Sequence, residues 1–408
     1  MTNSSLTRRT FVSAAAGSTT VLRSLGANNK VNIGLIGIGG RGSVHVKDLI
    51  ALKDLNITIA GVCDVWRVNR EKAVAAVEAG FGAKPKTTTD YREMLNWKDI
   101  DAVVIATPDF THPIILKAAV EAGKDAYVEK PFAVNLADAK AAYFAVKKSK
   151  QVVQAGSQRR SDPYLMAAAK QVRAGRLGQL TRIEFGVNFQ EPRWKRSNET
   201  VNPADVDWKM FQMGRIGKGF DQRLFREWQL FAGETTNGIP GLWMSHFIDL
   251  VPWFTEDPYP AGAVSNGGVY LWKDGRKTTD VFYTLLDYPK GFLVSFEMSL
   301  TNSGGDRCLW YGTLGTLDCE QRVSDGKGSS VMSGEGSNMK DKIKDKVELT
   351  PETTDSHMQN FLECIRSRQT PRADVQAGFS HAVAGIMTAE ALAKGRRMRF
   401  DPVKLEII

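Results

Sequence analysis

The segment from Gly37 to Gly42 constrains this chain most, because it places glycines at the spacing G-x-G-x-x-G directly after an apolar run. Residues 31–36 (VNIGLI) have the composition of a buried strand, and the glycines end it in a turn that leads into a helix. Gly37 permits the tight turn, Gly39 leaves the backbone open to a ligand, and Gly42 lets helix and strand pack closely. This order predicts a site for the pyrophosphate of a dinucleotide, because unpaired N–H groups at the helix N-terminus point at the anion.

Asp64 strengthens the interpretation, because it ends a second apolar run at residues 57–63. A carboxylate at about this distance downstream accepts hydrogen bonds from the adenosine ribose. The pair predicts a nicotinamide cofactor, NAD rather than NADP, since a charge at Asp64 would repel a 2′-phosphate. Arg67 and Arg70 are nearby cations that keep NADP open. The cofactor-binding residues predicted from this part of the chain are Gly37, Ile38, Gly39, Gly40, Arg41, Gly42 and Asp64.

The composition is that of an ordinary globular protein, with 42% apolar and 24% charged residues in a chain of 408. This length allows two domains with their own cores. The net charge of +9 arises partly in the first thirty residues, which carry cations and no acid. The basic and aromatic stretch 193–228 also carries several acids, so no nucleic-acid partner is expected. The histidines and cysteines lack metal-site spacing, so no metal is expected.

Arg8 and Arg9, in the segment TRRTFV, have the form of a twin-arginine export signal. Residues 11–22 are modestly apolar and too short to span a bilayer. We therefore expect residues 1–30 to be a signal and linker, and the protein to be periplasmic or otherwise exported. The segment is either cleaved or kept as an uncleaved anchor, and a disordered basic tail is the alternative. No later apolar run reaches ~18 residues, so no membrane span is expected.

Two domains are predicted after the signal. Strand-like runs and helical patterns alternate over residues 31–156, which predicts an α/β Rossmann domain with a doubly wound parallel sheet. Residues 157–408 have longer strands with period-two character, which predicts a substrate-binding α+β domain with a mostly antiparallel open sheet. The C-terminal helix, residues 375–394, is a candidate to pack back on the first domain. Residues 326–346, rich in Gly, Ser and Lys, are predicted to form a loop.

The expected strands of the two sheets are residues 31–36, 57–63, 102–106, 126–128, 152–155, 181–189, 282–286, 292–300 and 308–319. The expected helices are residues 70–79, 113–122, 136–148, 161–174, 357–367 and 375–394.

A second signature, Glu129-Lys130-Pro131, follows the strand-like run 126–128, at the sheet edge where open α/β folds bind ligands. With the glycine turn, the segment 107–131 (TPDFTHPIILKAAVEAGKDAYVEKP) resembles the Gfo/Idh/MocA family, which includes glucose–fructose oxidoreductase and inositol dehydrogenases. The resemblance covers nearly the whole chain past residue 32. It implies that the lysine lies beside the nicotinamide and the substrate hydroxyl. The cofactor-binding residues that it adds are Thr107, Pro108, His112, Glu129 and Lys130.

Lys130 suits the chemistry that this resemblance implies. A sugar carbinol that loses a hydride must also lose its hydroxyl proton, and a positioned base lowers the barrier. Burial and a neighbouring positive nicotinamide would lower the pKa of a lysine toward neutrality. A surface Glu-Lys pair at a strand end is the alternative.

The second domain matches the family's acid/base pattern D-x-x-x-H-x-x-D only in part. His246 and Asp249 match, but Leu242 occupies the place of the first aspartate. His246 can still exchange a proton near pH 7, although a leucine cannot balance its charge. A core histidine is the alternative. Trp243 stands where the family's nicotinamide-dependent glycoside hydrolases have a tyrosine, and tryptophan can stack on a sugar but has no acid/base oxygen.

Residues 188–228 form an insertion rich in Trp and Arg, side chains that bind sugars, with packing or oligomer contact as the alternative. The substrate-binding residues predicted from the second half of the chain are Arg159, Trp208, Arg226, Trp243, His246 and Asp249.

These residues together predict an NAD(P)-dependent oxidoreductase that acts on CH–OH groups of a sugar or sugar derivative, with Lys130 and His246 catalytic. Tight cofactor binding is expected, because an exported enzyme has no pool of NAD to recycle it. One alternative is an NAD-dependent glycoside hydrolase working by oxidation, elimination, hydration and reduction. Another is a non-catalytic sugar-binding protein, which Leu242 favours. A homo-oligomer is expected, because an open sheet face commonly packs against a partner.

Overall fold

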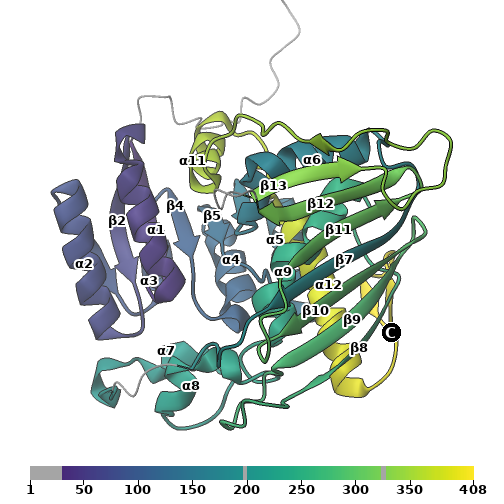
Figure 1. Ribbon diagram of the computed structural model, residues 1–408. Coiled ribbons are helices and arrows are strands. Elements are labelled where there is room, and N and C mark those ends of the chain that lie inside the picture. The colour runs from purple at the N-terminus through teal and green to yellow at the C-terminus, as the bar shows by residue number, and fades with distance from the viewer. Residues whose placement is uncertain (1–29, 196–199, 323–327) are drawn as a thin grey trace, which may run out of the picture.

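The computed structural model describes residues 30–195, 200–322 and 328–408, which form two domains built around two sheets (Figure 1). The export signal predicted at Arg8 and Arg9 lies outside the described residues. Among the helices that are described, none combines the length and the apolar character needed to cross a bilayer.

The first domain contains the predicted doubly wound sheet. Its six strands are all parallel, in the order β3-β2-β1-β4-β5-β6. The strands are β1 (Val31–Ile36), β2 (Ile57–Cys63), β3 (Lys86–Thr88), β4 (Ala102–Ile105), β5 (Asp125–Val128) and β6 (Val153–Ala155). The helices are α1 (Gly40–Ala51), α2 (Arg67–Phe81), α3 (Tyr91–Leu95), α4 (His112–Glu121) and α5 (Leu136–Lys148). The strand order reverses beside β1, and ligands bind at the carboxyl ends of the strands at such a point.

Apolar residues on both faces of each strand explain the position of this sheet. Ile33 and Leu35 of β1 pack in one cluster with residues of α1, α2 and α11 (His357–Ser367), while Ile36 joins a larger cluster on the other face. Strands buried on both faces form near-continuous apolar runs, as the sequence has here. A helix from the C-terminal half therefore covers one face of the first sheet, and Figure 1 shows α11 beside it.

The second domain is built on a ten-stranded sheet in the order β14-β13-β12-β11-β7-β10-β9-β8-β15-β16. Among the described strands of this second sheet, only β7 and β10 pair in parallel, which confirms the prediction of a mostly antiparallel sheet. The strands are β7 (Leu180–Asn188), β8 (Gly262–Gly268), β9 (Val281–Tyr288), β10 (Phe292–Ser299), β11 (Arg307–Gly312), β12 (Gly315–Arg322), β13 (Gly328–Ser333), β14 (Val347–Glu348), β15 (Met398–Asp401) and β16 (Glu406–Ile407).

One face of this sheet is packed and the other is open. Phe282 and Phe296 are buried, whereas Tyr283 and Leu285, which alternate with the buried residues of β9, are exposed. The helices of this half are α6 (Pro163–Arg173), α7 (Trp208–Gln212), α8 (Gln222–Arg226), α9 (Ser245–Ile248), α10 (Leu250–Thr255), α11 and α12 (Val375–Lys394). α12 contacts β8 of the second sheet and also α5 and β6 of the first domain. The homo-oligomer expected from the open face stays a prediction.

Two predictions for this domain were wrong. The stretch 308–319 is a hairpin of β11 and β12, because the chain turns at Thr313 and Leu314 between them. The segment 326–346 is not a loop throughout, because β13 pairs with β12 and its Ser330 and Val331 are buried. Glycine and serine dominate its sequence, so its strand depends on pairing with β12 rather than on local propensity.

Residues 200–230, here called the arm, leave the second domain and pack on the first. The arm carries α7 and α8, which lie below the first domain in Figure 1. The Asp207 amide donates to the carbonyl of Val65 over 2.8 Å, and Val206 pairs with Trp66 in a β-bridge. Trp66 shares a hydrophobic cluster with Val206 and other residues of the arm. The arm is therefore fastened to the loop that follows β2.

The closest approach between β1 and α1 provides a first prediction. A Cβ at Gly42 would lie 2.0 Å from the carbonyl oxygen of Gly37, whereas one at Gly40 would meet nothing within 4 Å. Gly42→Ala should therefore lower the free energy of unfolding by about 1–3 kcal/mol or more, the cost of overpacking. Gly40→Ala, the matched control, should leave it unchanged or raise it slightly. Denaturant unfolding of nucleotide-free protein measures both, and equal effects would contradict the packing argument.

Candidate active site

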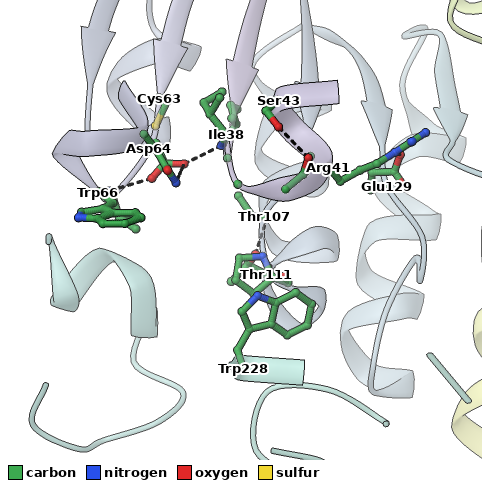
Figure 2. A pocket seen from close by; sticks show the side chains of 18 of the residues that line it. Ile38, Arg41, Ser43, Cys63, Asp64, Trp66, Thr107, Thr111, Glu129 and Trp228 are labelled. Atoms are coloured by element: carbon green, nitrogen blue, oxygen red, sulfur yellow. Dashed lines mark hydrogen bonds and ion pairs between the residues drawn. The ribbon is translucent and has the colours of Figure 1, made fainter. Parts of the chain in front are cut away.

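A cavity of about 830 Å³ lies at the carboxyl edge of the first sheet, where the ends of β1, β2, β4 and β5 meet the arm and residues from the second domain. Figure 2 shows its wall, with the glycine turn, Asp64, Glu129 and Trp228 facing the same space. The cavity brings together most of the predicted cofactor residues, namely Gly37, Ile38, Gly39, Gly40, Arg41, Asp64, Thr107, Pro108, His112, Glu129 and Lys130.

The glycine turn has the geometry that a pyrophosphate site needs. Gly37 has a φ of 86°, and a Cβ there would lie 2.7 Å from Thr107 Cγ2. Gly39 is the N-cap of α1, and a Cβ there would meet nothing within 4 Å, so its backbone faces open space. The helix begins at Gly40, with no acidic residue in its first turn. An anion in this cradle would meet backbone N–H groups and the positive end of the helix dipole. Gly42 does not line the cavity but packs beneath the turn.

Asp64 joins the end of β2 to this turn. Its Oδ2 accepts the Ile38 amide over 2.6 Å, and its Oδ1 accepts the Trp66 amide over 2.8 Å (Figure 2). Burial raises the pKa of Asp64, and these amide hydrogen bonds offset part of that rise. The carboxylate is thus held rigidly at the cavity wall, where it can accept a hydrogen bond from a ribose hydroxyl.

Arg67 and Arg70, the two cations that left NADP possible as the cofactor, interact with other groups of the protein. Arg67 is paired with Glu71 and with Asp205 of the arm, and it does not line the cavity. Arg70 donates to the carbonyl oxygen of Asp64 over 2.6 Å. Lys72 of α2, which sequence reasoning did not single out, does line the cavity.

Glu129 is the centre of a buried polar network at the end of β5. Its Oε1 accepts hydrogen bonds from Arg41 Nε, His45 Nε2 and Gln158 Nε2, each over 2.8 Å. Burial raises the pKa of this carboxyl, but the hydrogen bonds and charges of His45 and Arg41 outweigh it, so the pKa lies well below its usual range. Glu129 is therefore ionised and fixed. Sequence reasoning missed His45 and Gln158, because neither belongs to a motif and both come from distant parts of the chain.

Lys130 extends from this anchored strand end toward the second domain. Its Nζ donates to the carbonyl oxygen of Leu242 over 2.7 Å, and the peptide bond to Pro131 is cis. Burial lowers the pKa of Lys130. The acceptor lies in the π-helical turn Pro240–Met244, a distortion that is frequent at functional sites. The carbonyl fixes the position of the ammonium group without adding a charge to it.

His246 follows this turn and lines the same cavity. Burial lowers its pKa, and the positive charges of Lys130 and Arg159 lower it further, to well below the usual range. The imidazole is neutral near pH 7 and can accept a proton. Leu242, where the family pattern has an aspartate, also lines the cavity.

His112 holds the loop after β4 against the residues that follow β5. Its Nδ1 lies 2.8 Å from the Pro131 carbonyl oxygen, and its Nε2 lies 2.7 Å from that of Thr107. Thr107 Oγ1 accepts the hydroxyl of Thr111 over 2.6 Å, and Pro108 is the N-cap of the turn Asp109–Thr111. This group shapes the cavity wall near Lys130.

Asp109, in the same loop, was not predicted from the sequence. It is buried, it lines the cavity, and its Oδ2 accepts the Thr236 hydroxyl over 2.7 Å. Burial raises its pKa to about 6, although the charges of His112 and Lys130 act in the opposite direction. Its only signal in the sequence is an acidic residue within the segment TPDFTH.

The predicted substrate-binding residues are only partly brought to the cavity. Arg226 lines it at the end near Asp64, with its guanidinium 4.6 Å from the centre of the Trp66 ring. Trp243 and Arg159 do not line the cavity, although Trp243 lies beside His246, with 6.0 Å between ring centres, and its ring also contacts Phe189. Arg159 stacks over Phe247 at 4.1 Å.

Trp208 and Asp249 do not line the cavity. Trp208 stacks on Phe211 within the arm, and its Nε1 donates to the carbonyl of Lys218. Asp249 is buried, and its Oδ2 accepts Arg160 Nε over 2.8 Å. Trp208 therefore packs within the arm and Asp249 holds a buried ion pair, and a substrate-binding role for either stays a prediction.

Asp249 provides a prediction that separates stability from substrate binding. Burial raises its pKa, but Arg160 and His381 together outweigh this and hold it at about 2. A lowered pKa means that the stabilisation is present at neutral pH and is lost only in strong acid. Asp249→Asn should cost about 3–5 kcal/mol of unfolding free energy at pH 7, because it leaves Arg160 buried without its counter-charge.

The control is Asp99→Asn, which breaks an exposed ion pair with Lys86 and should cost less than about 1 kcal/mol. Denaturant unfolding measures both variants. An Asp249→Asn protein of unchanged stability that bound substrate more weakly would restore the predicted substrate-binding role.

Comparison with known proteins assigns the family. Residues 31–157 match the model "Oxidoreductase family, NAD-binding Rossmann fold" of the Gfo/Idh/MocA proteins, and residues 169–405 match the C-terminal alpha/beta domain of the same family. The chain belongs to the Gfo/Idh/MocA family. The NAD-binding domain agrees with the predicted NAD cofactor, and the glycine cradle and Asp64 fit that group.

The curated relatives include inositol 2-dehydrogenases and a levoglucosan dehydrogenase. Inositol 2-dehydrogenase of Salmonella typhimurium is 32% identical over 221 residues, which cover 50% of this chain and 64% of that protein. Levoglucosan dehydrogenase of Pseudarthrobacter phenanthrenivorans is 27% identical over 295 residues, which cover 70% of this chain and 72% of that protein. The chain spans 53% to 64% of the length of the first curated relatives that it matches.

Solved structures share the fold at low identity. Aldose-aldose oxidoreductase from Caulobacter crescentus, complexed with glycerol, aligns with a TM-score of 0.70 at 16% identity and covers 91% of this chain and 100% of that one. The WlbA dehydrogenase from Bordetella pertussis, in complex with NADH and UDP-GlcNAcA, aligns with a TM-score of 0.66 at 18% identity and covers 91% and 99%.

Proposed function

We propose that this protein is an NAD-dependent oxidoreductase that acts on a CH–OH group of a sugar or sugar derivative and holds its cofactor tightly. The observation that carries the proposal is the position of Lys130. Its ammonium is fixed on the Leu242 carbonyl, in the same cavity as the glycine cradle, Asp64 and neutral His246. The dehydrogenases among the relatives support the reaction class.

The residues that line the cavity would have different roles in the reaction, according to their charge and position. The glycine turn and Asp64 would hold the dinucleotide, which supplies the hydride acceptor when bound. Lys130, with a pKa lowered by burial, is placed to take the proton of the substrate hydroxyl. His246 is a neutral acceptor in the same cavity and can serve as the second acid/base group. Trp194 and Trp228 also line the cavity and offer aromatic faces for the C–H surface of a sugar ring.

The arm supports tight retention of the cofactor. Phe211, Phe225 and Arg226 of the arm line the cavity near Asp64, together with Trp66 of the first domain. The arm is tied to this region by the Asp207–Val65 hydrogen bond and the Arg67–Asp205 ion pair. A nucleotide under this cover could leave only after these contacts open. Retention matters most if the chain is exported, as Arg8 and Arg9 predict.

Lys130→Met tests the reaction class. Turnover of sugars and inositols, followed by the absorbance of reduced nicotinamide, should fall by about 10²–10⁴-fold, the usual contribution of a positioned acid or base. The nucleotide that co-purifies should be unchanged. Lys117→Met, at an exposed lysine paired with Glu121, is the matched control and should keep full activity.

Other outcomes would contradict the proposal. Equal turnover by Lys130→Met and the wild type would remove Lys130 from the reaction. Release of phenol from aryl glycosides without added cofactor would identify the glycoside hydrolase instead. If no sugar were turned over although many bound, the protein would be a binding protein.

Phe225→Ala tests retention. Loss of this ring from the wall of the cavity should speed release of bound NAD by about tenfold or more, since a large-to-small change in a packed cluster costs more than the 1.4 kcal/mol of a tenfold effect. Phe144→Ala, at an exposed phenylalanine of α5, is the control. Release is measured by exchange against a labelled nucleotide. Identical rates in the two variants would show that the arm does not retain the cofactor.

A further inference from the structure

Asp109 is a buried carboxylate at the wall of the cavity to which the mechanism above assigns no role. It lies in the turn Asp109–Thr111 after β4, is 3% exposed, and lines the same cavity as Lys130 and His246. Thr236, which donates to its Oδ2 over 2.7 Å, is itself buried and belongs to the second domain. The carboxylate is therefore held in place across the domain boundary, close to where the two domains meet at Leu242.

The donors around Asp109 differ from those around Glu129, the other carboxylate near Lys130. Glu129 accepts three side-chain donors on one oxygen, among them the Arg41 cation, and is thereby compensated. Asp109 accepts the neutral hydroxyl of Thr236. His112, the other titratable group facing Asp109, has both ring nitrogens within hydrogen-bond distance of backbone carbonyls. The Asp109 carboxylate therefore has fewer side-chain hydrogen-bond donors than that of Glu129, and the charges that oppose its burial are those of His112 and Lys130.

The buried ammonium group of Lys130 needs a negative charge nearby. Its hydrogen-bond acceptor is the Leu242 carbonyl, which carries no net charge, and Leu242 offers no carboxylate where the family pattern has one. The charged or titratable groups that act on Lys130 are Asp109 and Glu129, which favour the ammonium form, and Arg41, which disfavours it; His246 faces it from the second domain. Asp109 lies against the same turn that holds the lysine, because a Cβ at Gly241, the residue before Leu242, would be 3.5 Å from Asp109 Oδ2 and 3.2 Å from Pro131 Cγ.

We propose that Asp109 is the positioning carboxylate for Lys130, supplying from the β4 loop the negative charge that this chain lacks at residue 242. It acts through Lys130, by setting the pH at which the amine becomes free to take the substrate proton. The inference rests on the proposed function for its role in turnover, but the charge coupling between the two side chains can be measured without turnover.

The direction of the effect follows from the charges. Burial raises the pKa of Asp109 to about 6, so the carboxylate is charged above that pH. Asp109→Asn removes the charge and keeps an oxygen that can accept the Thr236 hydroxyl. Lys130 should then lose its proton at a pH lower by about one unit, the low end of the 1–3 units by which a neighbouring opposite charge shifts a pKa.

The experiment measures the titration of Lys130 directly. The intact protein, in the same nucleotide state throughout, is briefly acetylated at a series of pH values, and the extent of modification at Lys130 is read by mass spectrometry. Asp109→Asn should shift the midpoint to lower pH by about one unit, and the pH dependence of turnover should shift with it. Asp109→Ser, which also removes the charge, is the second variant if the asparagine protein does not fold.

Two controls separate charge from structure. Thr236→Val removes the hydrogen bond but keeps the carboxylate, so it should leave the midpoint for Lys130 in place above pH 7. Asp99→Asn removes a remote surface charge and should also leave it in place. In the double variant Asp109→Asn with Leu242→Asp, a carboxylate returned at residue 242 should move the midpoint back toward that of the wild type.

An unchanged midpoint for Lys130 in both Asp109→Asn and Asp109→Ser would overturn the inference, as would an equal shift in Thr236→Val. A shifted midpoint in a protein that turns over no sugar would leave the inference standing and reject the proposed reaction. Turnover of sugar with an unshifted midpoint for Lys130 would reject the inference and leave the proposed reaction standing.

Discussion

The buried charge of Glu129 is the constraint on which the rest of the site depends. A carboxylate taken out of water is stable only if donors surround it, and here they come from three parts of the chain. Arg41 belongs to the first turn of α1, His45 to its next turn, and Gln158 to the start of the second domain. The position of Lys130, the next residue after Glu129, is thereby tied to the glycine turn and to the domain boundary.

This arrangement explains why two neighbouring carboxylates differ in their acid strength. Both Glu129 and Asp109 are buried, and burial alone raises the pKa of each. Glu129 has cationic and histidine donors that reverse the effect, whereas Asp109 has a hydroxyl that does not. One carboxylate is therefore a permanent structural charge, and the other titrates within reach of ordinary conditions. Environments that separate the pKa values of nearby groups are typical of sites where protons move.

Much of the fold and part of the site could be predicted from the sequence, because both are encoded locally. The first sheet was predictable from short apolar runs such as Val31–Ile36, and the nucleotide cradle from glycines whose spacing has a backbone reason. β8 (Gly262–Gly268) was not predicted, because its glycine-rich sequence has little strand propensity and it is held by pairing with β9. The tip of the β11–β12 hairpin, at Thr313, lacks the usual turn residues.

The parts of the site that sequence reasoning missed are contacts between distant residues. Asp109 and Thr236 are 127 positions apart, and an aspartate in a loop gives no sign of burial or of its partner. Trp208 was assigned to the substrate because tryptophans bind sugars, yet a tryptophan also fills a small aromatic cluster, as it does against Phe211. Composition identifies what a side chain can do, while the packing of the arm on the first domain decides which of those roles it has.

The hydrogen bond from Lys130 to the Leu242 carbonyl shows why geometry and charge must be supplied separately in this site. A backbone carbonyl fixes the direction of an ammonium group, but as a neutral dipole it offsets little of the cost of burying the charge. An aspartate at residue 242 could supply direction and charge together; with a leucine there, the direction comes from the π-helical turn and the charge has to come from another element. The elements that can supply it are the ends of β4 and β5, where Asp109 and Glu129 stand. Because the charge of Glu129 is compensated by its own donors, the negative charge that stabilises the Lys130 ammonium has to come from the loop after β4. The same loop therefore couples the two domains.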